Sequence, residues 1–179
     1  MTIYGMKVRL RAIERSDIPT FVRWFNDPEV TQYLKMFMPM SVAQEERWFE
    51  NQLDDQRRFI FGIETLEGKL IGNIGLHDIN WKDRKAVLGI VIGEKEYWGQ
   101  GYGSDAIRTL LSFCFTRMNQ RRVSLSVWEY NKRAQRCYEK CGFQVEGRLR
   151  KAHFYGGEYH DEIVMSVLAE EFHDQKETI

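Results

Sequence analysis

The chain has 179 residues, of which 43% are hydrophobic and 13% aromatic. This length fits one domain of ordinary size, and the composition supplies enough apolar surface for a core. Lysine plus arginine (26) balance aspartate plus glutamate (26), so the chain lacks the positive field that would hold a nucleic acid or an acidic membrane surface. The composition therefore predicts a single domain over residues 1–179 without nucleic-acid or membrane partners.

The apolar runs and the cysteines predict a cytoplasmic protein. No run approaches the roughly 20 apolar residues that cross a bilayer, and the segment Met1 to Lys7 lacks the basic and apolar blocks of a signal peptide. Three cysteines do not make a disulfide framework, and the spacing of Cys137 and Cys141 is helical rather than that of a zinc knuckle. We expect reduced packing thiols and no metal site.

The first part of the chain predicts a strand followed by helices. Val8 to Ile13 alternates apolar with basic residues, which is typical of a strand with one wet face. Ser16 is the expected N-cap of a helix from Asp17 to Phe25. That helix should stop before Pro28, because the residue before a proline is disfavoured in the helical region. A short helical piece is expected from Pro28 to Leu34.

An unusually apolar loop, Met36-Phe37-Met38-Pro39-Met40, comes next. An exposed methionine-rich loop often lines a ligand groove, but flexible methionine side chains also fill irregular gaps in a core. Both interpretations stay open, and the loop is a candidate for the substrate side of a site. Ser41 with Gln44 then has the pattern of a capping box, which predicts a helix through about Asp54.

The second part of the chain predicts six strands and two helices. The continuous apolar run from Ala86 to Ile92 is typical of a central strand covered on both faces. Gly142 should end the last helix, and the polar tail from about residue 173 should fray. Together with the first strand and its helices, this order predicts a mixed α/β sheet. The strands are expected at Phe59–Thr65, Lys69–Ile79, Ala86–Ile92, Arg122–Val127, Phe143–Lys151 and His160–Leu168, and the helices at Ser104–Met118 and Lys132–Cys141.

A glycine-rich turn, Trp98-Gly99-Gln100-Gly101-Tyr102-Gly103-Ser104, joins the central strand to a helix start. Its backbone N–H groups are unobstructed at the three glycines, and the helix dipole favours an anion. The P-loop ending is absent, and the third glycine of the dinucleotide fingerprint would fall at Ser104. The turn predicts a bound phosphate or diphosphate, with a ligand-free connection as the alternative.

Several segments resemble the GNAT superfamily of acyl-CoA N-acetyltransferases. The narrower likeness is to the branch with the Rim ribosomal-protein N-terminal acetyltransferases and the spermidine acetyltransferases. It implies a predominantly antiparallel mixed sheet with a parallel splayed pair at the cofactor site and helices on both faces. The likeness rests on Gly89-Ile90-Val91-Ile92-Gly93 and Tyr97 to Gly103, on Asn131, Ala134, Tyr138, Gly142 and Phe143, and more weakly on Arg9-Leu10-Arg11, Asn26 to Val30 and Leu70-Ile71-Gly72.

The resemblance also implies the ligand and the residues that hold it. Acetyl-CoA would be the co-substrate, with its pantetheine and acetyl groups along the central strand and its diphosphate on the turn. Trp98 stands where the superfamily usually has Arg or Gln, so we assign it no charge role. The implied cofactor-binding residues are Ile90, Val91, Ile92, Gly99, Gln100, Gly101, Tyr102, Gly103, Ser104, Asn131, Ala134 and Tyr138.

Tyr138 matches the general acid of the superfamily. After an amine attacks the thioester, the departing thiolate needs a proton, and a phenol with a pKa near ~10 can donate one. The alternative role is packing, because Ala134, Cys137 and Cys141 share an apolar helix stripe with Tyr138.

The general base is less clear. Many relatives carry a glutamate where this chain has Val87, so the commonest carboxylate candidate is absent. The remaining candidates are His77, Asp78, Glu94 and Glu129, each of which could act through a water molecule.

The missing carboxylate bears on the acceptor. An amine of pKa ~10.4 is neutral in about one molecule in a few thousand at pH 7, whereas an α-amino group of pKa ~7.8 is neutral in about one in seven. The sequence therefore favours a protein or peptide N-terminal amine as acceptor. Alternatives are a polyamine, an aminoglycoside or an amino sugar, and a non-catalytic CoA-binding regulator. The hairpin around Tyr155 to Glu158 could pair with a second copy as a homodimer.

Overall fold

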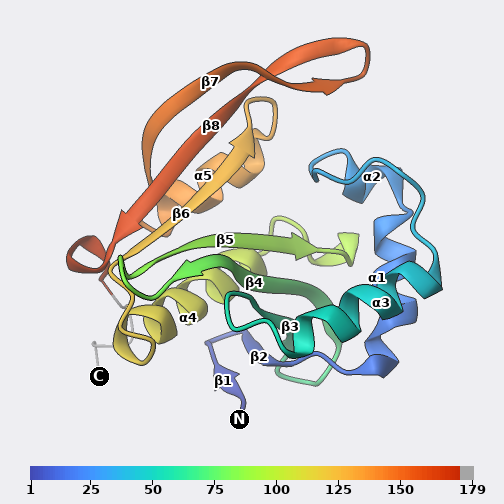
Figure 1. The fold of residues 1–179 in the computed structure, drawn as a ribbon, viewed down its shortest axis with the longest axis horizontal. Helices are drawn as coiled ribbons and strands as arrows, with labels where there is room; N and C mark the ends of the chain where they lie inside the picture. The colour runs from blue at the N-terminus through green and yellow to red at the C-terminus, as the bar shows by residue number, and fades with distance from the viewer. Residues whose placement is uncertain (174–179) are drawn as a thin grey trace.

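The structure is a computed structural model that describes residues 1–173, and its strands form one eight-stranded sheet (Figure 1). The strand order is β1-β2-β3-β4-β5-β6-β8-β7, and every neighbouring pair is antiparallel except β5 with β6. This confirms the mixed, mainly antiparallel sheet expected from the sequence. The strands are β1 (Ile3–Tyr4), β2 (Val8–Ala12), β3 (Phe59–Thr65), β4 (Leu70–Asn80), β5 (Lys85–Ile92), β6 (Arg122–Trp128), β7 (Gln144–Tyr155) and β8 (Glu158–Leu168).

Helices cover both faces of this sheet. Strand β2 shows why, because its side chains alternate between the two faces. Val8 and Leu10 pack into the main core with helix α4, while Arg11 on the opposite face pairs with Asp17 just before α1. The helices are α1 (Ile18–Phe25), α2 (Pro28–Thr31), α3 (Val42–Leu53), α4 (Tyr102–Thr116) and α5 (Lys132–Lys140), with short 3₁₀ turns at Arg15–Asp17, Lys95–Tyr97 and Ala169–Glu171.

Two expected helix starts were misplaced. Ser16 does not cap α1, because Glu14 and Asp17 form a capping box around a 3₁₀ turn and the α-helix follows at Ile18. Helix α4 starts at Tyr102 rather than Ser104, because Gly101 adopts a φ of 86° and lets the chain enter the helix directly after it. The predicted frayed tail lies almost wholly outside the described residues.

The sheet opens between its two parallel strands. Strands β5 and β6 pair only from Lys85 to Val87 against Arg122 to Ser124. Beyond these residues the two strands no longer pair with each other as they continue to Ile92 and Trp128, and Figure 1 shows them diverging. The expectation that β5 is covered on both faces is therefore wrong for its second half. Ala86 and Leu88 are buried, whereas the strand from Gly89 to Ile92 is only half-buried because it borders this opening.

The start of α4 is tied to the N-terminal strands by one carboxylate. Asp105 accepts backbone N–H bonds from Met6, Lys7 and Val8 at 3.1, 2.8 and 3.0 Å. Gly5 allows this close approach, because a Cβ there would lie 2.4 Å from the Asp105 carboxylate. The link fixes the helix start at the open end of β5.

One buried carboxyl group, that of Glu45, destabilises the folded chain when it is ionised. Glu45 in α3 is 2% exposed, and none of residues 1–173 donates a hydrogen bond to its Oε1. Burial raises the pKa of Glu45 to about 7. Between pH ~4.5 and ~7 the folded chain therefore binds a proton that the unfolded chain releases, so this group makes stability fall as pH rises through that window.

Glu45→Gln should remove the loss of stability that ionisation of this buried carboxyl causes. We expect its free energy of unfolding to exceed that of the parent by about 3 kcal/mol at pH 8 and to match it near pH 4.5. Urea denaturation across this pH range measures the difference. Glu46→Gln is the matched control, because Glu46 is exposed on the same helix. Parallel pH curves for Glu45→Gln and the parent would contradict the assignment.

Candidate active site

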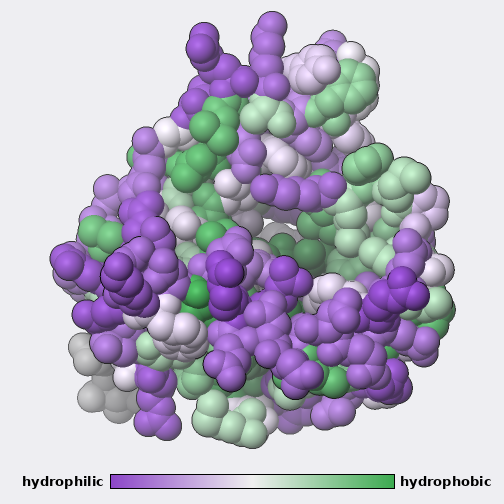
Figure 2. All heavy atoms as spheres, in the orientation of Figure 1, coloured by the Kyte–Doolittle hydropathy of each residue, from purple (hydrophilic) through white to green (hydrophobic). Residues whose placement is uncertain are grey.

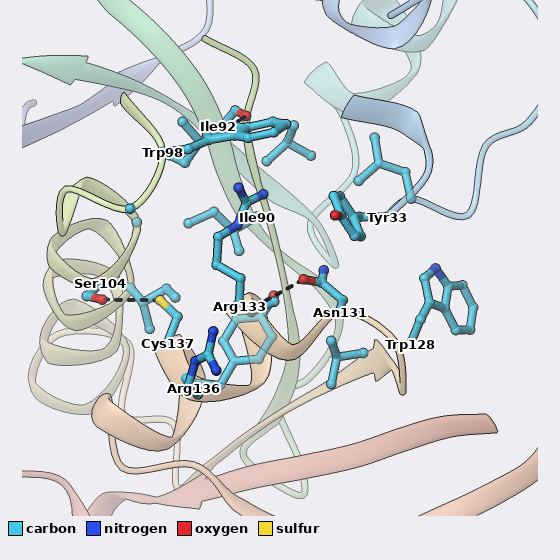
Figure 3. A pocket seen from close by; sticks show the side chains of 18 of the residues that line it. Tyr33, Ile90, Ile92, Trp98, Ser104, Trp128, Asn131, Arg133, Arg136 and Cys137 are labelled. Atoms are coloured by element: carbon cyan, nitrogen blue, oxygen red, sulfur yellow. Dashed lines mark hydrogen bonds between the residues drawn. The ribbon is translucent and has the colours of Figure 1, made fainter. Parts of the chain in front are cut away.

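A cavity of about 350 Å³ lies in the opening between β5 and β6. Helix α5 forms one wall, and the segment after α2 closes the other end (Figures 1 and 3). Figure 2 shows a hollow near the centre of the face in view, with hydrophobic atoms inside it and to its right and hydrophilic atoms above and below it. The cavity brings together ten of the twelve cofactor residues implied by the sequence, namely Ile90, Val91, Ile92, Gly99, Gly101, Gly103, Ser104, Asn131, Ala134 and Tyr138.

The other two implied residues, Gln100 and Tyr102, do not line the cavity. The Gln100 side chain donates a hydrogen bond to the carbonyl of Glu96, and Tyr102 packs edge-on against Tyr97 with ring centroids 5.0 Å apart. Any contact of these two residues with a ligand must therefore come from their backbone. Lys7 supports the turn from outside, with its Nζ donating to the Gln100 carbonyl at 2.9 Å.

The glycine turn leaves open space where an anion would lie. Gly99 and Gly101 have φ angles of 74° and 86°, in the left-handed region that favours glycine. A Cβ at Gly99 would meet no atom within 4 Å, and one at Gly103 would meet only Ile92 Cγ1 at 3.8 Å. The turn ends at the N-terminus of the 15-residue helix α4, where free N–H groups attract negative charge. These features fit a diphosphate.

Positive side chains on α5 face the same cavity. Arg133, Arg136 and Lys140 all line it, and the sequence analysis did not single them out. The Arg133 guanidinium lies 4.0 Å from the ring centroid of Trp98 and 5.5 Å from that of Tyr33 (Figure 3). Basic residues at every third or fourth position of a helix that follows Asn131 were the available signal. Their charge suits a phosphate-rich ligand.

Trp98 has a structural role rather than a charged one. Its indole Nε1 donates to the carbonyl of Ile92 at 2.7 Å, which ties the turn back to the end of β5. Arg133 then covers its ring. The positive charge near this end of the cavity therefore comes from α5 and not from position 98.

Tyr138 lies on the cavity wall with its ring packed on Phe143 at 5.9 Å. Burial raises the pKa of its phenol, with smaller contributions from Cys137 and Cys141. The hydroxyl therefore stays protonated at neutral pH. Asn131 begins this helix, and its Oδ1 accepts the N–H of Ala134 at 3.1 Å as an N-cap. The cap fixes the position of Tyr138, two turns further along.

Cys137 also lines the cavity, which the sequence analysis did not predict. Its Sγ lies 3.2 Å from the Ser104 hydroxyl and joins the first turn of α4 to the second half of α5 (Figure 3). A hydrogen bond from Cys141 lowers the pKa of Cys137, with further contributions from Ser104 and Arg108. The three cysteines form no disulfide.

The four candidate bases lie away from the cavity wall. Glu94 pairs with Arg23 and accepts the Trp24 indole N–H at 3.0 Å, and Asp78 is an exposed residue 3.9 Å from Arg57. His77 leans over Gly89, and burial lowers its pKa. Glu129 is held by Arg148 and the backbone N–H of Asp161. None of these residues lines the cavity.

Aromatic residues form the end of the cavity opposite the glycine turn. Tyr33 and Trp128 line it, and Trp128 stacks on His153 with centroids 3.8 Å apart and planes 5° apart. Tyr130 holds this wall together, since its hydroxyl donates to the Gln32 carbonyl at 2.7 Å. Its ring lies 6.2 Å from that of Tyr33. The methionine-rich loop from Met36 to Met40 does not line the cavity. Leu34 and Lys35, which come just before that loop, do line it.

The sequence family agrees with this geometry. The acetyltransferase (GNAT) domain family matches residues 7–144, most of the chain. The chain belongs to the GNAT acetyltransferase family. It is therefore an N-acetyltransferase that uses acetyl-CoA, and its fold is that of the family.

This GNAT enzyme is similar over most of its length to relatives of two named kinds. The spermidine N(1)-acetyltransferase of Vibrio cholerae is 29% identical over 171 residues, covering 96% of this chain and 98% of the relative. A crystal structure of the Vibrio cholerae enzyme with CoA and spermine superimposes with a TM-score of 0.87 at 30% identity, covering 92% and 97% of the two chains. The putative ribosomal N-acetyltransferase YdaF of Bacillus subtilis is 29% identical over 147 residues, covering 79% and 80%.

Several of these relatives are named for an acceptor other than the one expected first for this chain. The preference for a peptide N-terminal amine rested on Val87, but the relatives with the fullest coverage include enzymes named for spermidine. Base strength alone was a weak guide to the acceptor, because it ignores how the amine is bound. Within residues 1–173 no helix has both the length and the apolar character to cross a membrane, and no cluster of three or more His, Cys, Asp or Glu side chains could hold a metal ion.

Proposed function

We propose that this enzyme transfers the acetyl group of acetyl-CoA to a primary amine of a polyamine. The observation that supports it is the construction of the acceptor end, where aromatic faces lie beside a carboxylate. Tyr33 and Trp128 line the cavity there, and Glu162 lies next to this wall on β8. Aromatic faces and carboxylates together suit alkylammonium groups.

The opposite end supports acetyl-CoA in an extended pose. We assign the diphosphate to the backbone N–H groups of the turn from Gly99 to Ser104. Arg133 and Arg136 would neutralise its negative charge. Beyond Val87 the strand β5 has no partner in β6, so its backbone can pair with the amides of pantetheine. Asn131 and Ala134 complete the wall of this channel.

The chemistry that these residues carry out is a direct transfer. The amine nitrogen attacks the thioester carbonyl, the new C–N bond forms, and the C–S bond breaks. Tyr138, whose pKa is raised by burial, holds its proton until the thiolate leaves and then donates it. The amine releases its own proton to water, because none of the four candidate bases lines the cavity.

Thiol release from acetyl-CoA tests the proposal across spermidine, N-terminal peptides, aminoglycosides and amino sugars. We expect the highest kcat/KM with spermidine. Without a base in the cavity, this kcat/KM should rise about tenfold per pH unit from pH 7 to 9, following the neutral fraction of the amine. A higher kcat/KM on peptides would overturn the polyamine assignment, and tight CoA binding without turnover on any amine would indicate a regulator.

A cytoplasmic location and a homodimer remain predictions. The three thiols without disulfides fit a reducing compartment. Strand β7 forms an edge of the sheet and exposes Val145 and Leu149, which a second copy could cover.

A further inference from the structure

A lysine of this chain occupies the acceptor end of the cavity in the way a bound alkylammonium group would. Lys35 follows α2, lines the cavity, and places its Nζ 5.7 Å from the centroid of the Trp128 ring. The same Nζ lies 3.5 Å from Oε1 of Glu162. An aromatic face and a carboxylate around one ammonium are the elements of a cation site.

The receiving half of this arrangement is rigid and largely withdrawn from water. Trp128 is 6% exposed, and its stacking on His153 fixes the plane of the indole. The Glu162 side chain is 13% exposed. Among residues 1–173, Lys35 is the one cationic group within 4 Å of that carboxylate. Because the Glu162 carboxylate has little contact with water, it gains from a cation that approaches it more closely than the 3.5 Å of Lys35 Nζ.

The lysine half is loosely held. The side chain of Lys35 is 74% exposed, and at 3.5 Å its ion pair with Glu162 is long for a direct contact between ammonium and carboxylate. Exposed pairs of this kind contribute little, so an arriving ammonium group can displace Lys35 at small cost.

We propose that Trp128 and Glu162 form a subsite for a second, non-reacting ammonium group of the acceptor, which Lys35 fills in the free enzyme. The inference rests on the proposed polyamine function. Only the attacking amine must be neutral, whereas the other amines of a polyamine stay protonated at pH 7 and need a partner in the site. Lys35 is then an internal competitor for that partner.

The size of each effect follows from this competition. A cation–aromatic contact and one long ion pair from an exposed lysine correspond to an equilibrium constant of about 2 to 5 for occupation of the subsite by Lys35, so removing Lys35 should lower the KM for spermidine about 3-fold. Removing the charge of Glu162 should raise that KM about 5- to 10-fold. Neither change should alter the KM for n-butylamine, which has no second cation.

The experiment compares Lys35→Met and Glu162→Gln with the parent enzyme. It measures the ratio of KM for spermidine to KM for n-butylamine, and separately the calorimetric affinity of the CoA-loaded protein for spermidine. Lys82→Met and Glu67→Gln are matched controls, because both residues are exposed in turns and neither lines the cavity. The double variant should bind spermidine like Glu162→Gln alone.

The subsite is established if Lys35→Met lowers the ratio of the two KM values and binds spermidine more tightly by calorimetry, while Glu162→Gln raises the ratio and binds spermidine more weakly. A ratio within 2-fold of the parent for Glu162→Gln, or weaker spermidine binding by Lys35→Met, overturns it. The absence of thiol release with every amine instead refutes the polyamine function. The calorimetric comparison still decides the subsite in that case, because it needs no turnover.

Discussion

Tyr138→Phe should lower kcat about 100-fold or more while leaving the affinity for CoA unchanged. The substitution keeps the aromatic ring that packs on Phe143 and removes only the hydroxyl. General acid catalysis by a positioned side chain typically contributes about 10² to 10⁴ in rate. Because burial raises the pKa of Tyr138, the proton is present across the neutral range, and its loss in the variant should lower kcat throughout that range.

Two measurements separate catalysis from packing at this position. Single-turnover rates with acetyl-CoA report the chemical step, and calorimetry with CoA reports the integrity of the cavity. A phenylalanine variant that retains most of its kcat would mean that the tyrosine only packs on its helix. Cys141→Ala is a useful companion, since Cys141 is buried on the same helix end and does not line the cavity. It should lose stability without losing the chemical step.

Much of the fold is predictable because its elements carry strong local signals. The capping box of Ser41 and Gln44 starts α3 as expected, with both reciprocal hydrogen bonds present. Gly142 ends α5 with a φ of 94°. Errors arose where tertiary contacts decide, as at Ser16, whose capping role passes to Glu14 because Asp17 is engaged by Arg11. Strand β1 has two residues, too few for any periodicity.

The proposed cofactor half of the site could be predicted from the sequence, and the proposed acceptor half could not. The turn from Gly99 to Ser104 lies in one continuous segment, so its pattern is visible in the sequence. The acceptor end is assembled from residues after α2, at the end of β6 and on β8, which no local pattern joins. Trp128, Glu162 and Lys35 meet only through the sheet order, in which β8 follows β6. Fold topology was needed to find them.

Gly101→Ala should weaken acetyl-CoA binding about 10- to 100-fold. Gly101 has a φ of 86° and is the residue directly before α4. A side chain there is strained, so the turn shifts and misplaces the N–H groups that follow. Each hydrogen bond to a charged group contributes about 1.5 to 3 kcal/mol, and losing one or two of them accounts for the expected range.

Gly157→Ala separates ligand binding from backbone strain. Gly157 has nearly the same φ, 87°, and a Cβ there would meet no atom within 4 Å. Both variants should lose about 1 kcal/mol of stability by urea denaturation, since the backbone penalty is the same. Only Gly101→Ala should lose affinity for acetyl-CoA by calorimetry, because only Gly101 borders the cavity. Equal affinities in the two variants would place the diphosphate elsewhere and leave the turn a structural connection.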